Sequence, residues 1–207
     1  MDNSKIRRSS ADSALRRQSY GASATKAQAT AGNVGGGGIY LGIGGNIGDR
    51  ELNLTRALTI ISAHPDMRLL RVSSFYRTSP WGVTEQPWFL NAICEIGTVI
   101  YPAALLEELK WIERILGREK STPRWGPRAI DLDIILYRSI VMRTPLLTIP
   151  HKHCKERLFV LMPLVEIAPC IVHPETGVSF KNYLDELLKT QPEEACLKYN
   201  QIAYKKP

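Results

Sequence analysis

The first patterned stretch of the chain reads Ile39-Tyr40-Leu41-Gly42-Ile43-Gly44 and runs into the turn Gly44-Gly45-Asn46-Ile47-Gly48-Asp49. A short apolar run before such a turn predicts a buried strand. A helix is expected after it, because Leu54, Ala57, Leu58 and Ile61 share one helical face. The turn matches neither G-x-G-x-x-G nor G-x-x-x-x-G-K-[ST], so we interpret it as a tight turn that brings backbone close to a ligand.

Strands and helices alternate along the rest of the pattern. Strands are expected at Met67–Arg77, Phe89–Val99 and Ala129–Tyr137, and helices at Ala103–Leu116 and Phe180–Leu188. The order strand, helix, strand, strand, helix, strand favours a single α+β domain, a ferredoxin-like sheet with helices packed on one face.

Composition divides the chain into three parts. Residues 1–38 are rich in Ser, Ala, Gly and Arg and carry six Lys and Arg against two Asp. They predict a disordered basic extension with a glycine-rich joint, which suits an organelle transit peptide or a dispensable tail. Residues 39–190 are expected to form the catalytic domain, and residues 191–207 a C-terminal tail.

The whole-chain composition is that of a globular protein with one core. The 207 residues are 44% hydrophobic and 23% charged, with a net charge of +7 that favours anionic partners. No apolar run approaches the roughly 20 residues that a membrane helix needs. The four cysteines form no C-x-x-C pair, which favours reduced thiols and a cytoplasmic location.

Two acids interrupt the apolar strand expected at Ala129–Tyr137. Residues two apart in a strand share a side, so Asp131 and Asp133 should project together while Leu132, Ile134 and Leu136 face the core. Paired carboxylates can hold Mg²⁺ and suit phosphoryl-type transfer. The alternative is a pair of solvated acids on an edge strand, although Asp is a poor strand former and such conflicts favour a functional site.

A basic loop precedes the acids. Its cations are Arg118, Lys120, Arg124 and Arg128. Arginine offers bidentate donors to phosphate oxygens, and a loop can close over a polyphosphate. The alternative is a solvated loop that docks nucleic acid. Trp125 suits stacking on a nucleobase or plugging the edge of a core.

Two further groups of side chains are candidates for binding. Thr78, Ser79, Trp81, Gln86, Phe89 and Asn91 combine aromatic surfaces with an amide that can read a flat heteroaromatic ring; the alternative for Trp81 and Phe89 is core packing. His151 and His153 flank Lys152 and can bind metal or donate to phosphate, but no third zinc ligand is evident in the sequence.

Several of these stretches together resemble one enzyme family. They are Ser73-Ser74-Phe75-Tyr76-Arg77-Thr78, Phe89-Leu90-Asn91, Arg124-Trp125-Gly126-Pro127-Arg128, Asp131-Leu132-Asp133 and Leu147-Thr148-Ile149-Pro150-His151. The family is 6-hydroxymethyl-7,8-dihydropterin pyrophosphokinase of folate biosynthesis, and the resemblance covers Ile39 to Leu188. It implies transfer of pyrophosphate from ATP to the pterin hydroxymethyl group, with release of AMP.

The resemblance also implies roles for single residues. Asp131 and Asp133 would ligate two Mg²⁺ ions and, with Arg118, Arg124 and Arg128, form the catalytic set. The implied ATP contacts are Glu113, Lys120, Trp125, Ile134, Thr148, His151 and Arg157. The implied pterin contacts are Thr78, Ser79, Trp81, Phe89, Asn91 and Phe159, with the ring sandwiched between the two phenylalanines.

Some positions depart from the commoner family pattern. Lys120 stands where arginine is frequent and cannot make a bidentate contact. Phe89, Ser79 and Lys152 replace tyrosine, proline and an aromatic residue. The chain has no room for the fused domains of some relatives, so a monofunctional monomer that binds neither nucleic acid nor membrane is expected. The competing hypotheses are a nucleic-acid-binding module and a non-enzymatic nucleotide sensor.

Overall fold

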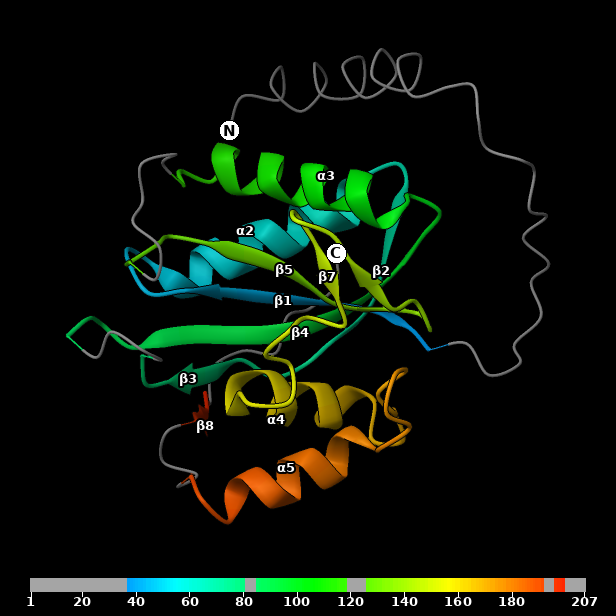
Figure 1. Cartoon of the computed structure of the whole chain (residues 1–207). Coiled ribbons are helices and arrows are strands. Elements are labelled where there is room, and N and C mark those ends of the chain that lie inside the picture. The colour runs from blue at the N-terminus through cyan, green and yellow to red at the C-terminus, as the bar shows by residue number, and fades with distance from the viewer. Residues whose placement is uncertain (1–36, 81–84, 119–125, 192–195, 200–207) are drawn as a thin grey trace. The chain divides into compact units, whose positions relative to one another are not determined.

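The computed structural model of this chain describes residues 37–80, 85–118, 126–191 and 196–199. Their main sheet has the order β5-β1-β4-β3-β8, with β2 also paired to β4 (Figure 1). The strands are β1 (Ile39–Gly45), β2 (Met67–Val72), β3 (Tyr76–Thr78), β4 (Phe89–Thr98), β5 (Asp131–Tyr137) and β8 (Cys196–Lys198). Each pairing in this sheet is antiparallel.

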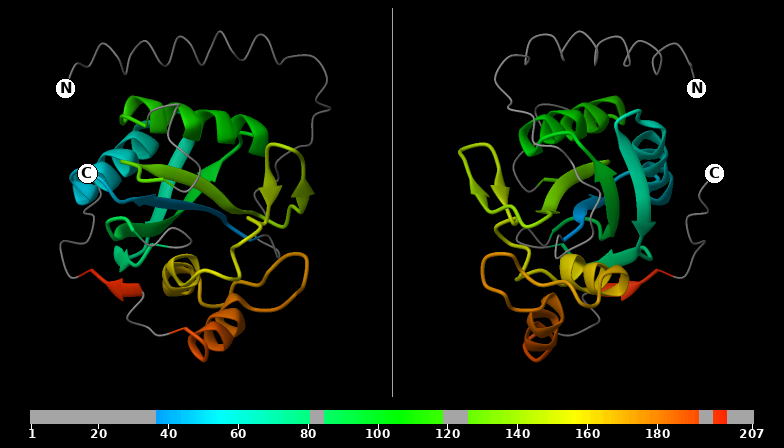
Figure 2. Two further views of the ribbon diagram at one scale, coloured as in Figure 1. Left: turned by 60° about the vertical axis from the view of Figure 1, so that its left-hand side comes forward. Right: turned by 90° about the vertical axis from the view of Figure 1, so that its right-hand side faces the viewer.

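Helices cover both faces of the sheet, where the sequence pattern predicted only one covered face (Figure 2). Helices α2 (Arg50–Ala63) and α3 (Pro102–Ile115) pack on one face, α4 (Leu158–Ile167) packs on the other, and α5 (Phe180–Leu188) packs against α4. The prediction was wrong because α4 was not foreseen: it carries Pro163 and has apolar residues on most sides, so it lacks a clear amphipathic period.

The opening strand, turn and helix form as the sequence predicts. Strand β1 is buried along nearly its whole length, and Leu54, Ala57, Leu58 and Ile61 are the buried residues of α2. Gly48 has a φ of 68°, which glycine adopts without strain. The Asp49 side chain then accepts a hydrogen bond from the Leu52 N–H and caps α2.

The segment predicted as one strand over Met67–Arg77 is divided into β2 and β3, which both pair with β4. The interruption lies at residues 73–75, where the Ser73 hydroxyl accepts from the Ile93 N–H and donates to the Ser74 carbonyl. A side chain thus replaces regular strand pairing at this point.

Strand β5 contains an irregularity that changes one predicted side-chain direction. Leu41 pairs with Ile134 and Tyr40 with Leu136, so Ile135 is an extra residue in β5. Such a bulge interrupts the alternation of faces. Leu132 and Ile134 face α2 and α3 as predicted, but Leu136 packs with Tyr40 on the α4 side, and its predicted direction was wrong.

Three short strands complete the described structure. β6 (Met142–Arg143) and β7 (Thr148–Ile149) form a separate two-stranded sheet. β8 lies within the range predicted as a C-terminal tail, yet it pairs with β3 and buries Cys196. No helix of the described residues is long and apolar enough to cross a membrane.

Candidate active site

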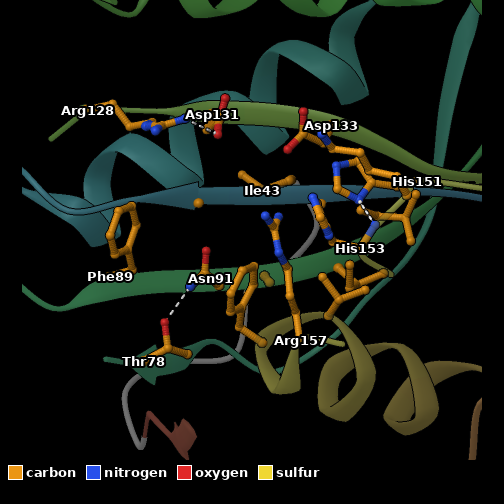
Figure 3. Close-up of a pocket in the computed structure, with 18 of the residues that line it drawn as sticks. Ile43, Thr78, Phe89, Asn91, Arg128, Asp131, Asp133, His151, His153 and Arg157 are labelled. Atoms are coloured by element: carbon orange, nitrogen blue, oxygen red, sulfur yellow. Dashed lines mark hydrogen bonds and ion pairs between the residues drawn. The ribbon is translucent and has the colours of Figure 1, made fainter. Parts of the chain in front are cut away.

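A cleft of about 340 Å³ opens on the α4 side of the sheet, over β4, β1 and β5 (Figure 3). The centre of its floor is formed by the backbone of β1, because Gly42 and Gly44 have no side chains. Gly44 pairs with Asn91 on one side and with Asp131 on the other. A Cβ atom at Gly44 would collide with Asn91 Oδ1, so a larger residue here would displace the Asn91 side chain.

One wall of the cleft combines an amide with two aromatic rings. Asn91 Nδ2 donates to Thr78 Oγ1 over 2.7 Å, and both side chains are buried. This bond fixes the amide so that Asn91 Oδ1 lies over Gly44. Phe89 from β4 and Phe159 from α4 line the cleft beside it. The wall therefore presents a fixed acceptor next to apolar ring surfaces.

The opposite wall carries the two carboxylates of β5. Asp131 and Asp133 both line the cleft, as the strand period predicts (Figure 3). Asp131 accepts from Arg118 Nη1 and, over 2.6 Å, from Arg128 Nη1. Arg128 is itself anchored to the glycine-rich turn, because its N–H donates to Asn46 Oδ1 over 2.8 Å.

The two carboxylates have opposite pKa shifts. Burial acts to raise the pKa of Asp131, but the nearby cations Arg128, Lys110 and Arg118 outweigh it and lower that pKa. Burial and the charge of Asp131 raise the pKa of Asp133 to about 6. Asp133 thus lies in a buried, negatively charged environment that an additional cation would relieve.

The rim near α4 is basic. Arg157 points from the start of α4 toward the sheet, and His151 and His153 lie beside it (Figure 3). Burial, with the charges of Arg157, His153 and Lys152, lowers the pKa of His151 to about 4. His151 is therefore neutral at ordinary pH. The described residues hold no group of three or more His, Cys, Asp or Glu suited to a metal, which leaves the histidine pair without a third zinc ligand there.

Comparison with known proteins identifies the family. A family model described as 7,8-dihydro-6-hydroxymethylpterin-pyrophosphokinase matches residues 40–169. The chain belongs to this pyrophosphokinase family. A 2-amino-4-hydroxy-6-hydroxymethyldihydropteridine pyrophosphokinase of Methylorubrum extorquens is 47% identical over 133 residues, 64% of this chain and 84% of that protein. The Bacillus subtilis protein of the same name is 45% identical over 128 residues, 62% and 76% of the two chains.

Other relatives of this pyrophosphokinase are longer. The folic acid synthesis protein fol1 of Schizosaccharomyces pombe is 43% identical over 148 residues, which are 72% of this chain but 20% of that protein. A crystal structure of Plasmodium falciparum HPPK-DHPS superposes with a TM-score of 0.60 at 16% identity, covering 75% of this chain and 45% of that one. This likeness shows the fold, so the predicted ferredoxin-like α+β class is confirmed.

Most of the predicted site residues of the pyrophosphokinase meet in the cleft. Those that line it are Thr78, Ser79, Phe89, Asn91, Arg118, Arg128, Asp131, Asp133, His151, Arg157 and Phe159. Trp81, Lys120, Arg124 and Trp125 lie outside the described residues. Segments far apart in the sequence thus converge on one face of the sheet.

Three predicted ATP contacts do not line the cleft. Glu113 is 2% exposed and lies behind β5 on α3, Ile134 is in the core beside α2 and α3, and Thr148 is on β7. Their contacts with ATP stay predictions.

Sequence patterns also missed residues that do line the cleft. Lys110 on α3 reaches it, and its ammonium lies 3.9 Å from Asp131 Oδ1. The only signal for Lys110 is its three-residue spacing from Glu113 on the helix. The floor glycines, Gly42 and Gly44, were foreseen only as backbone close to a ligand, since their position between β4 and β5 depends on strand register.

Proposed function

We propose that this cleft is where the chain transfers pyrophosphate from ATP to the hydroxymethyl group of 6-hydroxymethyl-7,8-dihydropterin and releases AMP, in folate biosynthesis. Membership of the pyrophosphokinase family supports the reaction. The observation that carries the assignment to this cleft is that two walls of different chemistry face each other across it. A fixed amide and two aromatic residues face two carboxylates across a floor of glycines.

The amide wall suits the pterin. Asn91 Nδ2 is already used by Thr78, so Asn91 Oδ1 remains to accept hydrogen bonds from N–H groups of a ring. Phe89 and Phe159 offer faces for stacking, which leaves the polar ring edge for the amide. Ser79 lines the same end of the cleft. Trp81 belongs to this set by resemblance alone.

The carboxylate wall suits magnesium. Asp131 and Asp133 supply hard oxygen donors from one side of β5, and burial together with the nearby charge of Asp131 raises the pKa of Asp133. These two residues would hold two Mg²⁺ ions together with the ATP phosphates. When bound, the ions would supply positive charge that neutralises the polyphosphate.

The basic side chains around the carboxylates suit the phosphates. Arg118 and Arg128 pair with Asp131 at the cleft, and the phosphates of bound ATP would offer these guanidinium groups further acceptors. Arg157 and neutral His151 offer further donors on the α4 side. Arg124, Lys120 and Trp125 complete the proposed ATP contacts from the loop.

The experiment that tests this function identifies the products. Purified protein is incubated with ATP, Mg²⁺ and the reduced hydroxymethylpterin, and the products are separated and weighed by mass spectrometry. We expect AMP and a pterin heavier by one pyrophosphoryl group. ADP with a monophosphorylated pterin would contradict pyrophosphoryl transfer. Absence of turnover by folded protein would instead favour a nucleotide sensor or a nucleic-acid-binding module.

We also propose that the enzyme is a cytoplasmic monomer. The observation in favour of a cytoplasmic location is that Cys94, Cys154, Cys170 and Cys196 are all free, with three of them buried, as in a reducing compartment. Light scattering coupled to size-exclusion chromatography should give the mass of one chain, 23.2 kDa. Twice that mass would contradict a monomer.

A further inference from the structure

The backbone between the two site carboxylates lies at an edge of the sheet. β5 pairs with β1 through Asp131 and Asp133, opposite Gly44 and Gly42, and it ends the strand order of the main sheet. In an antiparallel pair, every second residue directs its N–H and C=O groups away from the partner strand. Leu132 is the residue of this kind between the two aspartates.

Two side chains of α3 occupy this edge in place of another strand. The Leu132 N–H donates to Glu113 Oε1 over 2.7 Å, and the Leu132 carbonyl accepts from Lys110 Nζ over 3.2 Å. Lys110 and Glu113 are joined by a bond of 2.7 Å and lie three residues apart on one face of the helix. One ion pair thereby satisfies both backbone groups of Leu132.

Glu113 is also connected to the site carboxylates through Arg118. Its Oε2 atom pairs with Arg118 Nη1 over 2.7 Å, and Arg118 also pairs with Asp131. Glu113 is buried, so loss of its carboxylate would leave a backbone N–H, an ammonium and a guanidinium short of an acceptor at once. The contacts lie behind the carboxylate wall and touch neither Asn91 nor Thr78.

We propose that Lys110 and Glu113 are positioning residues of the pyrophosphokinase. They hold the Leu132 backbone from α3 and thereby set the spacing and direction of Asp131 and Asp133 for divalent cations. The proposal rests on the proposed function for its catalytic meaning. The geometric part of the proposal, an ion pair that completes the edge of β5, can be tested without measuring turnover.

The direct test is hydrogen exchange at the Leu132 amide in metal-free protein, followed by NMR. We compare Glu113→Ala with Glu113→Gln, which keeps a carbonyl acceptor, and with Glu107→Ala, an exposed position of α3. Glu113→Ala should accelerate exchange at Leu132 by about tenfold or more, while Glu107→Ala and Glu113→Gln should leave it slow. Equal exchange in all three variants would overturn the proposal.

A second readout concerns the metal. Binding of Mn²⁺ together with a non-hydrolysable ATP analogue is measured by electron paramagnetic resonance, and pterin binding by fluorescence. Glu113→Ala and Lys110→Met should weaken Mn²⁺ binding by about 10- to 100-fold, the range for residues that support metal ligands, and leave pterin binding unchanged. Equal losses of both affinities would indicate general damage and overturn the positioning role. Failure of turnover in wild-type protein, with these effects intact, would instead refute the proposed function alone.

Discussion

Gly44 leaves space for the Asn91 amide because glycine has no side chain. The Asn91 amide donates to Thr78 and its oxygen occupies the space where a Cβ of residue 44 would lie. The identity of Asp131, Asp133, Phe89 and Asn91 as site candidates could be predicted, because polar and aromatic residues interrupt apolar strands there. The need for glycine at 44 could not, since it follows from the register of β1 against β4.

Gly44→Ala tests this arrangement. The added methyl group should push the Asn91 amide away from Thr78 and raise the KM for the pterin by about 10- to 100-fold, with a smaller change in the KM for ATP. Steady-state kinetics with each substrate varied in turn provide the measurement. Gly97→Ala in β4 is the control, because a Cβ there meets Leu70 only at an ordinary distance of 3.7 Å. Equal pterin KM values in the two variants would refute the role of Gly44.

His151 provides a prediction about pH. Its pKa of about 4, against roughly 6.5 in an unfolded chain, means that the folded protein resists protonation of this ring. Its contribution to folding stability is therefore complete above about pH 6.5 and is lost as pH falls toward 4. NMR titration should show the His151 ring signals unchanged from pH 8 to about pH 5.5. A midpoint near 6.5 would show that the ring is not desolvated.

At the scale of elements, α4 is the part that sequence patterns failed to predict, yet it supplies Arg157 and Phe159. It is fixed by contacts between distant segments. Glu166 accepts from the Ser74 N–H and hydroxyl, from Tyr76 OH and from Lys198, and Arg71 donates to the Ile167 carbonyl. Periodicity within a helix carries no information on such contacts, and the same is true of the bulge at Ile135.

Glu166→Ala should loosen α4 from the sheet. It removes one acceptor from several donors at once, so we expect the free energy of unfolding to fall by about 1–3 kcal/mol. Chemical denaturation provides the value. Glu186→Ala on α5 is the matched control, since Glu186 pairs across one helical turn with Lys189 and is largely exposed. A loss for Glu166→Ala no larger than for Glu186→Ala would show that these hydrogen bonds do not stabilise α4.

At the scale of the whole molecule, the sheet and its strand-helix order followed from hydrophobic period, while the strand near the C-terminus did not. β8 joins β3 near the C-terminus, and the Tyr199 N–H donates to the Phe75 carbonyl over 2.7 Å. A strand of three residues has too little pattern to be predicted from sequence. Its existence depends on an open edge at β3, which only the assembled sheet provides.

Deletions at the two ends of the chain should therefore have different effects on the Tm. Removal of residues 1–36, whose composition predicts no packed core, should leave the Tm and turnover unchanged. Removal of residues 192–207 takes away β8 with buried Cys196 and should lower the Tm by several degrees, roughly the effect of 1–2 kcal/mol. Thermal unfolding of both proteins decides this. A large loss of turnover in the first deletion would place residues 1–36 in the catalytic unit.

The measurement that tests the central claim most directly is the rate of AMP formation as Mg²⁺ is varied, with ATP and the reduced pterin in excess. Wild-type protein is compared with Asp131→Asn, Asp133→Asn and the control Asp185→Asn, an exposed position of α5 where Asp185 pairs with Lys181. We expect Mg²⁺-dependent AMP formation that falls by roughly 10³-fold or more in the first two variants and is unchanged in the third. Undiminished AMP formation by folded Asp131→Asn and Asp133→Asn proteins would contradict the account.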